Sequence, residues 1–234
     1  MCKRNIIITI ALTLLIFASA GFAAERNQWY YVGNEEGCRQ FAVPVAGRDY
    51  VAAKTTCVIP ARMEVIFMVL RDIAGYPEWL ENCKATKILK VVDDENDVFI
   101  FWFRQHITFF KDRDVVIKSK TVIDLKNGRN IVYSDKTGEM AFDTGKRYVR
   151  MPSFGSSFTL EWVDRERTRV TFMIDPDPGK GLPVQEANIE IIKTTHKSLK
   201  NMMKMVKKSK YIEAAKTSKY NKYVEDGIRK GYLK

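Results

Sequence analysis

The cysteines are the residues whose spacing suggests a specific bond. Of four cysteines in the 234-residue chain, Cys38, Cys57 and Cys83 lie beyond the first apolar segment. Two runs typical of strands, residues 38–45 and 50–59, flank a turn at Ala46-Gly47-Arg48. If this hairpin centres near Gly47 and Arg48, Cys38 lies directly opposite Cys57, so a cross-strand disulfide is geometrically possible. Cys83 would then remain as a buried thiol.

The other residues that could hold a metal ion are sparse. The chain has only two histidines, His106 and His196, which are far apart in the sequence. No group of cysteines, histidines or acids has the spacing of metal ligands. We therefore expect no zinc, haem or other cofactor.

A long amphipathic helix near the C-terminus is the element around which these residues must be arranged. Pro183 suits the first turn of a helix, and residues 184–208 contain neither Gly nor Pro. At helical spacing one stripe of this segment is apolar, and the opposite face carries Glu and Lys. The apolar stripe consists of Val184, Ala187, Ile191, Thr195, Leu199, Met202 and Val206.

Strands account for most of the remaining chain. After a possible lead-in helix over residues 25–36 and the cysteine hairpin, two short helices are expected over residues 60–74 and 76–80. Short alternating segments joined by turns follow, up to residue 174. This order predicts an α+β fold in which a curved antiparallel sheet of about seven to nine strands wraps around the long helix. A sheet curved around one helix is hard to fill with side chains, so a cavity between them is expected.

The N-terminus predicts an exported protein, and the charge is concentrated near the C-terminus. Lys3 and Arg4 precede an apolar run and small-residue cleavage sites, which is the pattern of a signal peptide over residues 1–23. Cleavage would follow Ala23 or Ala20, and retention as an anchor is the alternative. The net charge is +11, and residues 193–234 hold thirteen Lys and Arg against three acids. We expect a periplasmic or secreted monomer with no nucleic-acid partner.

Four segments resemble the START family of lipid-transfer domains, part of the helix-grip superfamily. They are VIFMVLRDIAGYPEWL at residues 65–80, KDRDVV at 111–116, MPSFGSSFTLEW at 151–162 and DPDPGKGLPVQEAN at 175–188. Lys180 replaces a glycine of the family pattern, and Gln185-Glu186 replaces an apolar pair. The resemblance implies a lipid-binding domain over residues 24–210, followed by a basic helical tail at 211–234. It also implies that one lipid or other hydrophobic small molecule binds without catalysis, and that Asp72 and Arg113 are either structural or contact a head group.

The candidate ligand-binding residues combine the apolar sheet face with the border of the long helix. Ordinary core packing is the alternative for each apolar residue. For Arg104 the alternative is an outward-facing side chain, and for His196 a position at the edge of the helix. The candidates are Phe99, Phe101, Phe103, Arg104, Ile117, Ile131, Phe158, Phe172, Leu182, Ile189, Ile192 and His196.

The basic helix face has two interpretations. It could dock transiently on an anionic membrane, where each basic residue is worth about 1 kcal/mol. It could equally be a solvated helix face, as most charge runs are. The residues concerned are Lys193, Lys197, Lys200, Lys204, Lys207 and Lys208.

Two other functions remain open. The helix-grip superfamily includes polyketide cyclases and aromatases, whose chemistry needs a general acid or base in the cavity. His196, Tyr133 and Asp143 are the candidates for that role, but no two of them have a spacing that suggests cooperation. The other alternative is a protein-interaction module that uses the basic tail.

Overall fold

A single sheet of ten strands forms the body of the protein. The computed structural model describes residues 28–234, so the predicted signal peptide and the start of the possible lead-in helix lie outside these residues. The strand order is β1-β2-β3-β10-β9-β7-β6-β5-β4, and all of these neighbours pair antiparallel. The short β8 pairs parallel with β6. The strands are β1 (Tyr30–Glu35), β2 (Cys38–Pro44), β3 (Val51–Ile59), β4 (Cys83–Asp93), β5 (Val98–Gln105), β6 (Arg113–Asp124), β7 (Arg129–Lys136), β8 (Val149–Arg150), β9 (Ser153–Asp164) and β10 (Arg167–Asp177).

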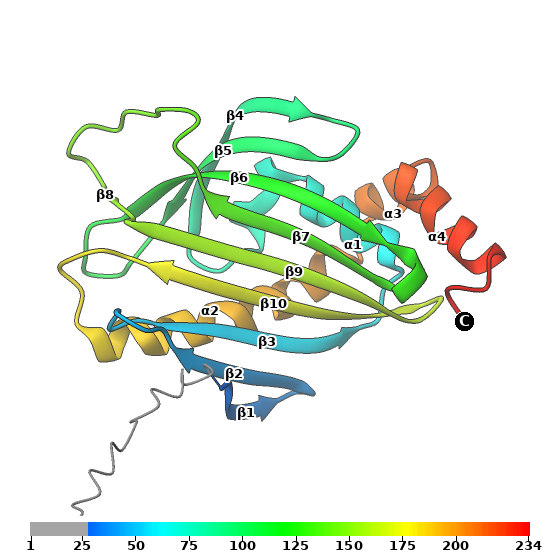
Figure 1. The fold of residues 1–234 in the computed structure, drawn as a ribbon, viewed down its shortest axis with the longest axis horizontal. Helices are drawn as coiled ribbons and strands as arrows, with labels where there is room; N and C mark the ends of the chain where they lie inside the picture. Colours follow the sequence, from blue (N-terminus) through cyan, green and yellow to red (C-terminus); the bar gives the residue numbers. More distant parts are fainter. Residues whose placement is uncertain (1–27) are drawn as a thin grey trace, which may run out of the picture.

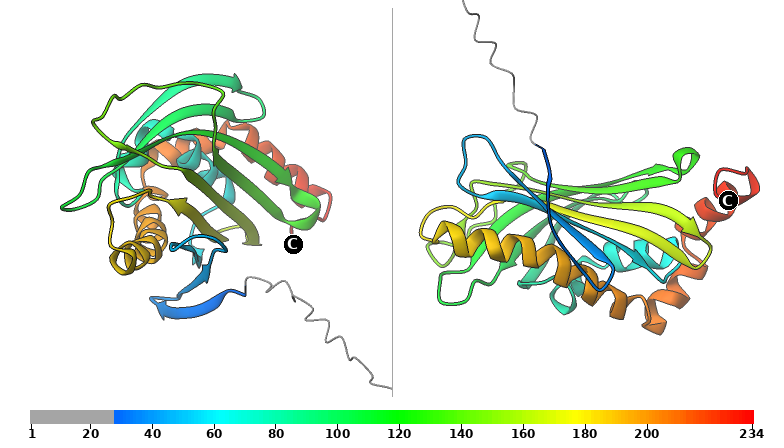
Figure 2. Two further views of the ribbon diagram at one scale, coloured as in Figure 1. Left: turned by 60° about the vertical axis from the view of Figure 1, so that its left-hand side comes forward. Right: turned by 90° about the horizontal axis from the view of Figure 1, so that it is seen from below.

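The helices lie on the concave face of this sheet. The long helix α2 (Val184–Met205) runs along β2, β3 and β10, as Figures 1 and 2 show. Beside it lie the helix α1 (Met63–Arg71) and the 3-10 helix η1 (Ile73–Glu78); the short 3-10 turn η2 (Leu125–Asn127) joins β6 to β7. Two further helices, α3 (Ser209–Lys216) and α4 (Lys219–Arg229), follow α2 at the end of the molecule that carries the C-terminus. The predicted α+β helix-grip fold is therefore confirmed.

Two layers of packing explain why β5 is buried along most of its length. Phe99, Phe101 and Phe103 face the helices and belong to the main core. Ile100 and Trp102 face the other way, where a small second core forms with Val116. Side chains of the loop over residues 137–148 cover this second core from outside. The expected alternation is present, but both faces of the strand are covered.

Several local expectations were wrong at the ends of elements. The segment that includes Tyr30 and Tyr31 is the edge strand β1 rather than part of a helix, since it pairs with β2. Strand β9 begins at Ser153, so Gly155 lies within the strand and pairs with Asp175 and Asp135. The expected helix over 60–74 ends at Arg71, and Gly75 lies inside η1.

The hairpin of β2 and β3 places the first two cysteines together. Arg39 pairs with Thr56, so Cys38 and Cys57 lie opposite each other, with their Cα atoms 4.5 Å apart. A disulfide joins them, and Cys83 is a buried free thiol. Burial raises the pKa of that thiol to about 12.

Residues 209–234 are packed into the main core. Tyr211, Ala215, Tyr220, Val224 and Leu233 are all buried in it. The ring of Tyr220 stacks on Phe67 of α1, with ring centroids 4.4 Å apart. The basic segment is thus helical and lies along the domain.

Candidate functional site

A cavity of about 390 Å³ lies between the first half of α2 and one end of the sheet. It is at the end where α2 begins, opposite the end that carries α3 and α4 (Figure 1). Its walls come from α2, the residues before β4, the end of β5 with the loop that follows, the first part of β9, and β10 with the turn that leads into α2. The lining residues are Leu80, Glu81, Asn82, Phe103, Gln105, His106, Ile107, Thr108, Phe110, Phe154, Phe172, Ile174, Pro176, Pro178, Leu182, Pro183, Glu186, Ala187, Glu190, Ile191, Thr194 and Lys197.

The sheet side of the cavity is apolar and rigidly packed. Phe103 of β5 lies against Phe154 of β9, with ring centroids 6.0 Å apart. Phe172 of β10 stacks on Phe158 behind it at 4.1 Å. Leu182 and Ile191 complete the apolar lining from the turn and the helix. Such a wall suits an apolar ligand body.

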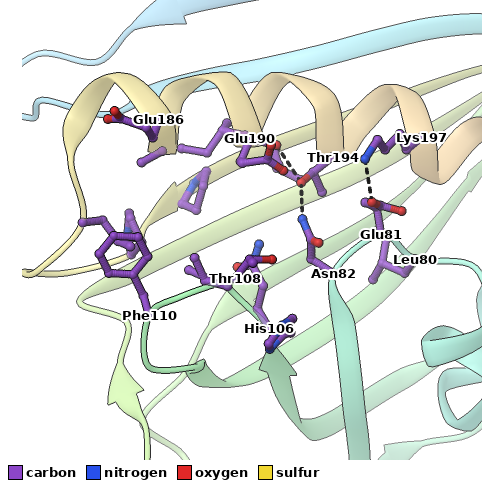
Figure 3. A pocket seen from close by; sticks show the side chains of 18 of the residues that line it. Leu80, Glu81, Asn82, His106, Thr108, Phe110, Glu186, Glu190, Thr194 and Lys197 are labelled. Atoms are coloured by element: carbon purple, nitrogen blue, oxygen red, sulfur yellow. Dashed lines mark hydrogen bonds and ion pairs between the residues drawn. The ribbon is translucent and has the colours of Figure 1, made fainter.

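The polar side comes from α2 and from the segment before β4 (Figure 3). The Lys197 ammonium lies 3.0 Å from a carboxylate oxygen of Glu81, and this hydrogen bond raises the pKa of Lys197. The Asn82 amide donates to the Thr194 hydroxyl at 3.3 Å, and that hydroxyl donates to the Glu190 carbonyl at 2.7 Å. The segment before β4 is thereby held against the helix.

The loop over residues 106–112 forms the outer wall of the cavity. His106 lines the cavity, and its Nδ1 lies 2.9 Å from Oδ1 of Asp112. Phe110 also lines the cavity, whereas the neighbouring Phe109 is 98% exposed. Phe109 adopts a left-handed backbone conformation, with φ of 68°. The tip of this loop therefore presents an aromatic ring to the solvent next to Phe110 of the cavity wall.

Arg113 fastens two segments that contribute to the cavity wall, the loop after β5 and the turn before α2. Its side chain is buried and donates hydrogen bonds to the carbonyl groups of Pro178 at 3.2 Å and Lys180 at 3.1 Å. It also donates to the carbonyl of Lys111 in the outer loop. Of the two roles left open for Arg113, the structure favours the structural one, because its donors are used by backbone acceptors.

Asp72 is a paired structural acid. Its carboxylate accepts hydrogen bonds from the Tyr211 hydroxyl at 2.9 Å, the Lys210 ammonium at 3.2 Å and the Gly75 amide at 3.1 Å. Burial tends to raise the pKa of Asp72, but these hydrogen bonds outweigh it and leave the pKa lowered. Asp72 joins η1 to α3 and lies outside the cavity lining.

Three of the predicted ligand-binding residues line the cavity: Phe103, Phe172 and Leu182. Four others lie on the same sheet face but pack in the main core and are not among the residues that line the cavity. These four are Phe99, Phe101, Ile117 and Phe158. The strand residues that line the cavity differ from those that do not in their position along their strands. The alternation of apolar and polar residues does not specify that position.

Two predicted residues point to the convex face of the sheet. Arg104 has the opposite parity to Phe103, and its guanidinium donates to the Tyr148 hydroxyl at 2.8 Å. Ile131 has the opposite parity to the buried Val132 and is half-buried. Neither lines the cavity, and the outward-facing alternative for Arg104 holds.

The three predicted border residues of the helix do not look into the cavity. Ile189 is 43% exposed, and Ile192 packs against the main core. His196 is buried, with Nδ1 3.5 Å from a carboxylate oxygen of Glu35 on β1. The face of α2 that lines the cavity contains Glu186, Glu190, Thr194 and Lys197 instead. These residues recur at helical spacing, but the charges of Glu186, Glu190 and Lys197 led us to expect that this face of α2 would be in contact with solvent.

The predicted acid–base residues are also outside the cavity. Tyr133 is 42% exposed on β7, Asp143 is exposed in the 137–148 loop, and His196 faces β1. The residues that sequence reasoning missed, such as Asn82, His106 and Phe110, lie in segments without periodicity. No cluster of three or more potential metal ligands occurs within residues 28–234.

Acids neutralise much of the basic helix face. Lys197, Lys200 and Lys208 form ion pairs with Glu81, Glu36 and Glu78, and Lys193 lies 3.5 Å from Glu190. Lys204 and Lys207 have no acidic partner in the part of the chain that the structure describes. In that same part, no helix is long and apolar enough to cross a membrane.

A curved sheet that holds one long helix over a cavity defines the helix-grip class. A model of the family described as polyketide cyclase/dehydrase and lipid transport matches residues 59–203, and the chain belongs to this family. An uncharacterised protein of Pseudomonas aeruginosa is 23% identical over 205 residues, which cover 88% of this chain and 99% of that protein.

Solved structures have the same fold. A STAR-related lipid transfer protein from Xanthomonas axonopodis has a TM-score of 0.68 and 20% identity, covering 77% of this chain and 99% of that one. Human STARD10 has a TM-score of 0.69 and 17% identity, covering 80% of this chain and 76% of that one. The predicted START and helix-grip resemblance is thereby confirmed.

Proposed function

We propose that this protein binds a single amphiphile in the cavity between the sheet and α2, for transfer or sequestration outside the cytoplasm. The observation that carries the proposal is the cavity of about 390 Å³ with an apolar sheet wall. An engineered apolar cavity of about 150 Å³ holds one benzene molecule. By that comparison the volume suits one acyl chain or a few fused rings.

The site of exchange that we propose is the mouth beside Phe109 and Phe110. The exposed lysines Lys111, Lys146 and Lys180 belong to the loops that meet there, and the Lys111 ammonium donates to the Lys146 carbonyl at 3.3 Å. Aromatic rings flanked by basic side chains favour the interface of an anionic membrane. A membrane contact at this point would place the cavity mouth against the lipid.

Two features support our proposal of a role in the periplasm or outside the cell. The Cys38–Cys57 disulfide is typical of an oxidising compartment. The N-terminal segment has the pattern of a signal peptide. The proposed ligand would therefore be one that is exchanged with a membrane facing that compartment.

Extraction and mass spectrometry test the proposal. The purified protein should release one amphiphile per chain and should bind it again after delipidation. Ala187→Phe would fill the cavity from α2, so it should lower this binding at least tenfold. Ile189→Phe, on the exposed side of the same helix, is the matched control and should bind as the parent does. Absence of any stoichiometric amphiphile, with none rebound, contradicts the proposal.

One pair of residues favours an enzyme of the cyclase or dehydrase type as a second candidate. His106 lies in the cavity wall with its Nδ1 bonded to Asp112, an arrangement that can fix an imidazole for general acid–base catalysis. A polyketide-like substrate analogue turned over by the parent, and not by His106→Ala, would support this candidate. A binding protein would retain its amphiphile in that variant and show no turnover in either form.

A further inference from the structure

The charged residues of the cavity are unbalanced towards acids. Glu81, Glu186 and Glu190 line it, against a single ammonium from Lys197. That ammonium is already held by Glu81, with nitrogen and oxygen 3.0 Å apart. Glu186 and Glu190 extend from α2 on the same side of the cavity (Figure 3). An anionic head group would find no uncommitted cation among the lining residues and would meet the carboxylates of Glu186 and Glu190, of which, within residues 28–234, only Glu190 has a lysine, Lys193, within 3.5 Å.

The polar groups at this wall offer more hydrogen-bond acceptors than donors to a ligand. Thr194 is only 6% exposed, and its hydroxyl hydrogen is directed to the Glu190 carbonyl. Asn82 uses one N–H of its amide on Thr194, which leaves its carbonyl oxygen as an acceptor and its second N–H as a donor. An amide oxygen or carboxylate in a partly buried site is stabilised by a donor from the ligand.

We propose that the ligand is a single-chain or compact-ring amphiphile whose head donates hydrogen bonds and carries no negative charge. Its head would lie between Asn82, Thr194 and Glu190, and its apolar body would lie along Phe103, Phe154 and Phe172. A hydroxyl or a protonated amine satisfies these acceptors, whereas a carboxylate or phosphate does not. This inference rests on the proposed function, because it assigns the chemistry of the same cavity.

Three probes with one tail test the inference: tetradecanol, tetradecylamine and tetradecanoate, each competing with neutral N-phenyl-1-naphthylamine at low salt and pH 8. The alcohol and the amine should bind at least tenfold more tightly than the carboxylate. The double variant Glu186→Gln/Glu190→Gln should reduce the difference in affinity between the amine and the carboxylate. The affinity for the alcohol should stay unchanged. Glu213→Gln, on the exposed surface of α3, is the matched control and should change none of the three affinities.

The outcomes separate the inference from the proposed function. Tetradecanoate that binds as tightly as the alcohol to the parent protein overturns the inference and leaves amphiphile binding intact. If the difference in affinity between amine and carboxylate is unchanged in the double variant, the role of the two glutamates is overturned. Failure of all three probes to displace the dye, together with no co-purified amphiphile, overturns the proposed function itself.

Discussion

At the scale of single residues, Arg113 controls the geometry of the cavity mouth. Its buried guanidinium spreads its donors over three carbonyl groups from two segments. A lysine ammonium keeps the charge but lacks the planar fork that reaches several acceptors at once. The mouth should therefore depend on the guanidinium shape and not only on its charge.

Arg113→Lys should lower the free energy of unfolding by about 1–3 kcal/mol, the cost of buried acceptors that lose their donors. Urea denaturation measures this change. Arg169→Lys, exposed on β10, is the matched control and should stay within about 0.5 kcal/mol of the parent. Equal stabilities for the two variants would show that the buried contacts of Arg113 contribute nothing specific.

Asp72 makes the docking of α3 dependent on pH. Because its pKa in the folded protein lies below the unfolded value of about 3.9, its contribution to stability is present above that value. The contribution is lost as the pH falls through the folded pKa. Asp72→Asn should thus be less stable than the parent by about 1–2 kcal/mol at neutral pH, since it loses charge-assisted hydrogen bonds.

The stability difference for Asp72→Asn should shrink below about pH 4, when the parent carboxyl becomes protonated. Urea midpoints of both proteins across this pH range provide the measurement. The exposed Glu95→Gln serves as the control for general effects of acid. If the stability difference between the two proteins stays constant down to the lowest pH at which both fold, the ionised Asp72 carboxylate does not stabilise the docking of α3.

At the scale of elements, α4 is part of the core and not an appendage. Tyr220 is 2% exposed, stacks on Phe67 of α1, and donates its hydroxyl to the buried Asp97. Asp97 in turn binds Arg71 and Lys219. These contacts tie the last helices to α1 and to the turn between β4 and β5.

Tyr220→Ala should lower the free energy of unfolding by about 3–5 kcal/mol, as expected when a buried aromatic ring is deleted. Tyr220→Phe keeps the stacked ring and should cost less, about 1–3 kcal/mol for the lost hydroxyl. Tyr232→Ala, at a half-exposed ring near the C-terminus, is the control. If Tyr220→Ala is as stable as that control, α4 is not docked in solution.

Element types could be predicted from the sequence because most strands have one apolar face and α2 has a clear apolar stripe. The register of β2 and β3 also followed from the turn near Gly47, which is why Cys38 could be set opposite Cys57. The edge strand β1 could not be found in this way. Its side chains are largely exposed, so only its pairing with β2 fixes it.

The existence of a cavity could be predicted from the sequence, but its position along the sheet could not. Phe101 and Phe103 are indistinguishable by alternation, yet Phe101 is core and Phe103 lines the cavity. The difference arises from where α2 and the 106–112 loop end over the sheet, which is a property of tertiary structure. For the same reason His196 could not be assigned, because the strand β1 that covers it was expected to be helical.

At the scale of the whole molecule, the proposed mouth is separated from Lys204 and Lys207, the two lysines of the basic helix face that have no acidic partner among the described residues. Lys204 lies in the last turn of α2 and Lys207 just after it, whereas the α2 residues that line the cavity belong to the first part of the helix; Figure 1 shows these two ends of α2 far apart. A helix of this length spans about 33 Å. A membrane that touched only the far lysines would not touch the mouth. Transfer of an amphiphile is most direct if the loop at Phe109 makes the contact.

Vesicle sedimentation distinguishes these two orientations. Phe109→Ser should weaken binding to phosphatidylglycerol-containing vesicles about tenfold or more, because burying a phenylalanine ring contributes about 1.5–3 kcal/mol. The ring is almost fully exposed, so its loss should leave folding unchanged. High salt should weaken the binding of both proteins further, since it screens Lys111, Lys146 and Lys180.

The paired variant Lys204→Ala/Lys207→Ala is the matched comparison for the basic helix face. If the mouth docks first, this variant should bind vesicles nearly as the parent does, because its charges lie far from the contact. The reverse pattern, with binding lost in the lysine variant and retained in Phe109→Ser, would instead support docking through the helix face. Lipid exchange would then require a reorientation on the membrane, since the cavity that Phe110 and Leu182 line lies at the other end of α2.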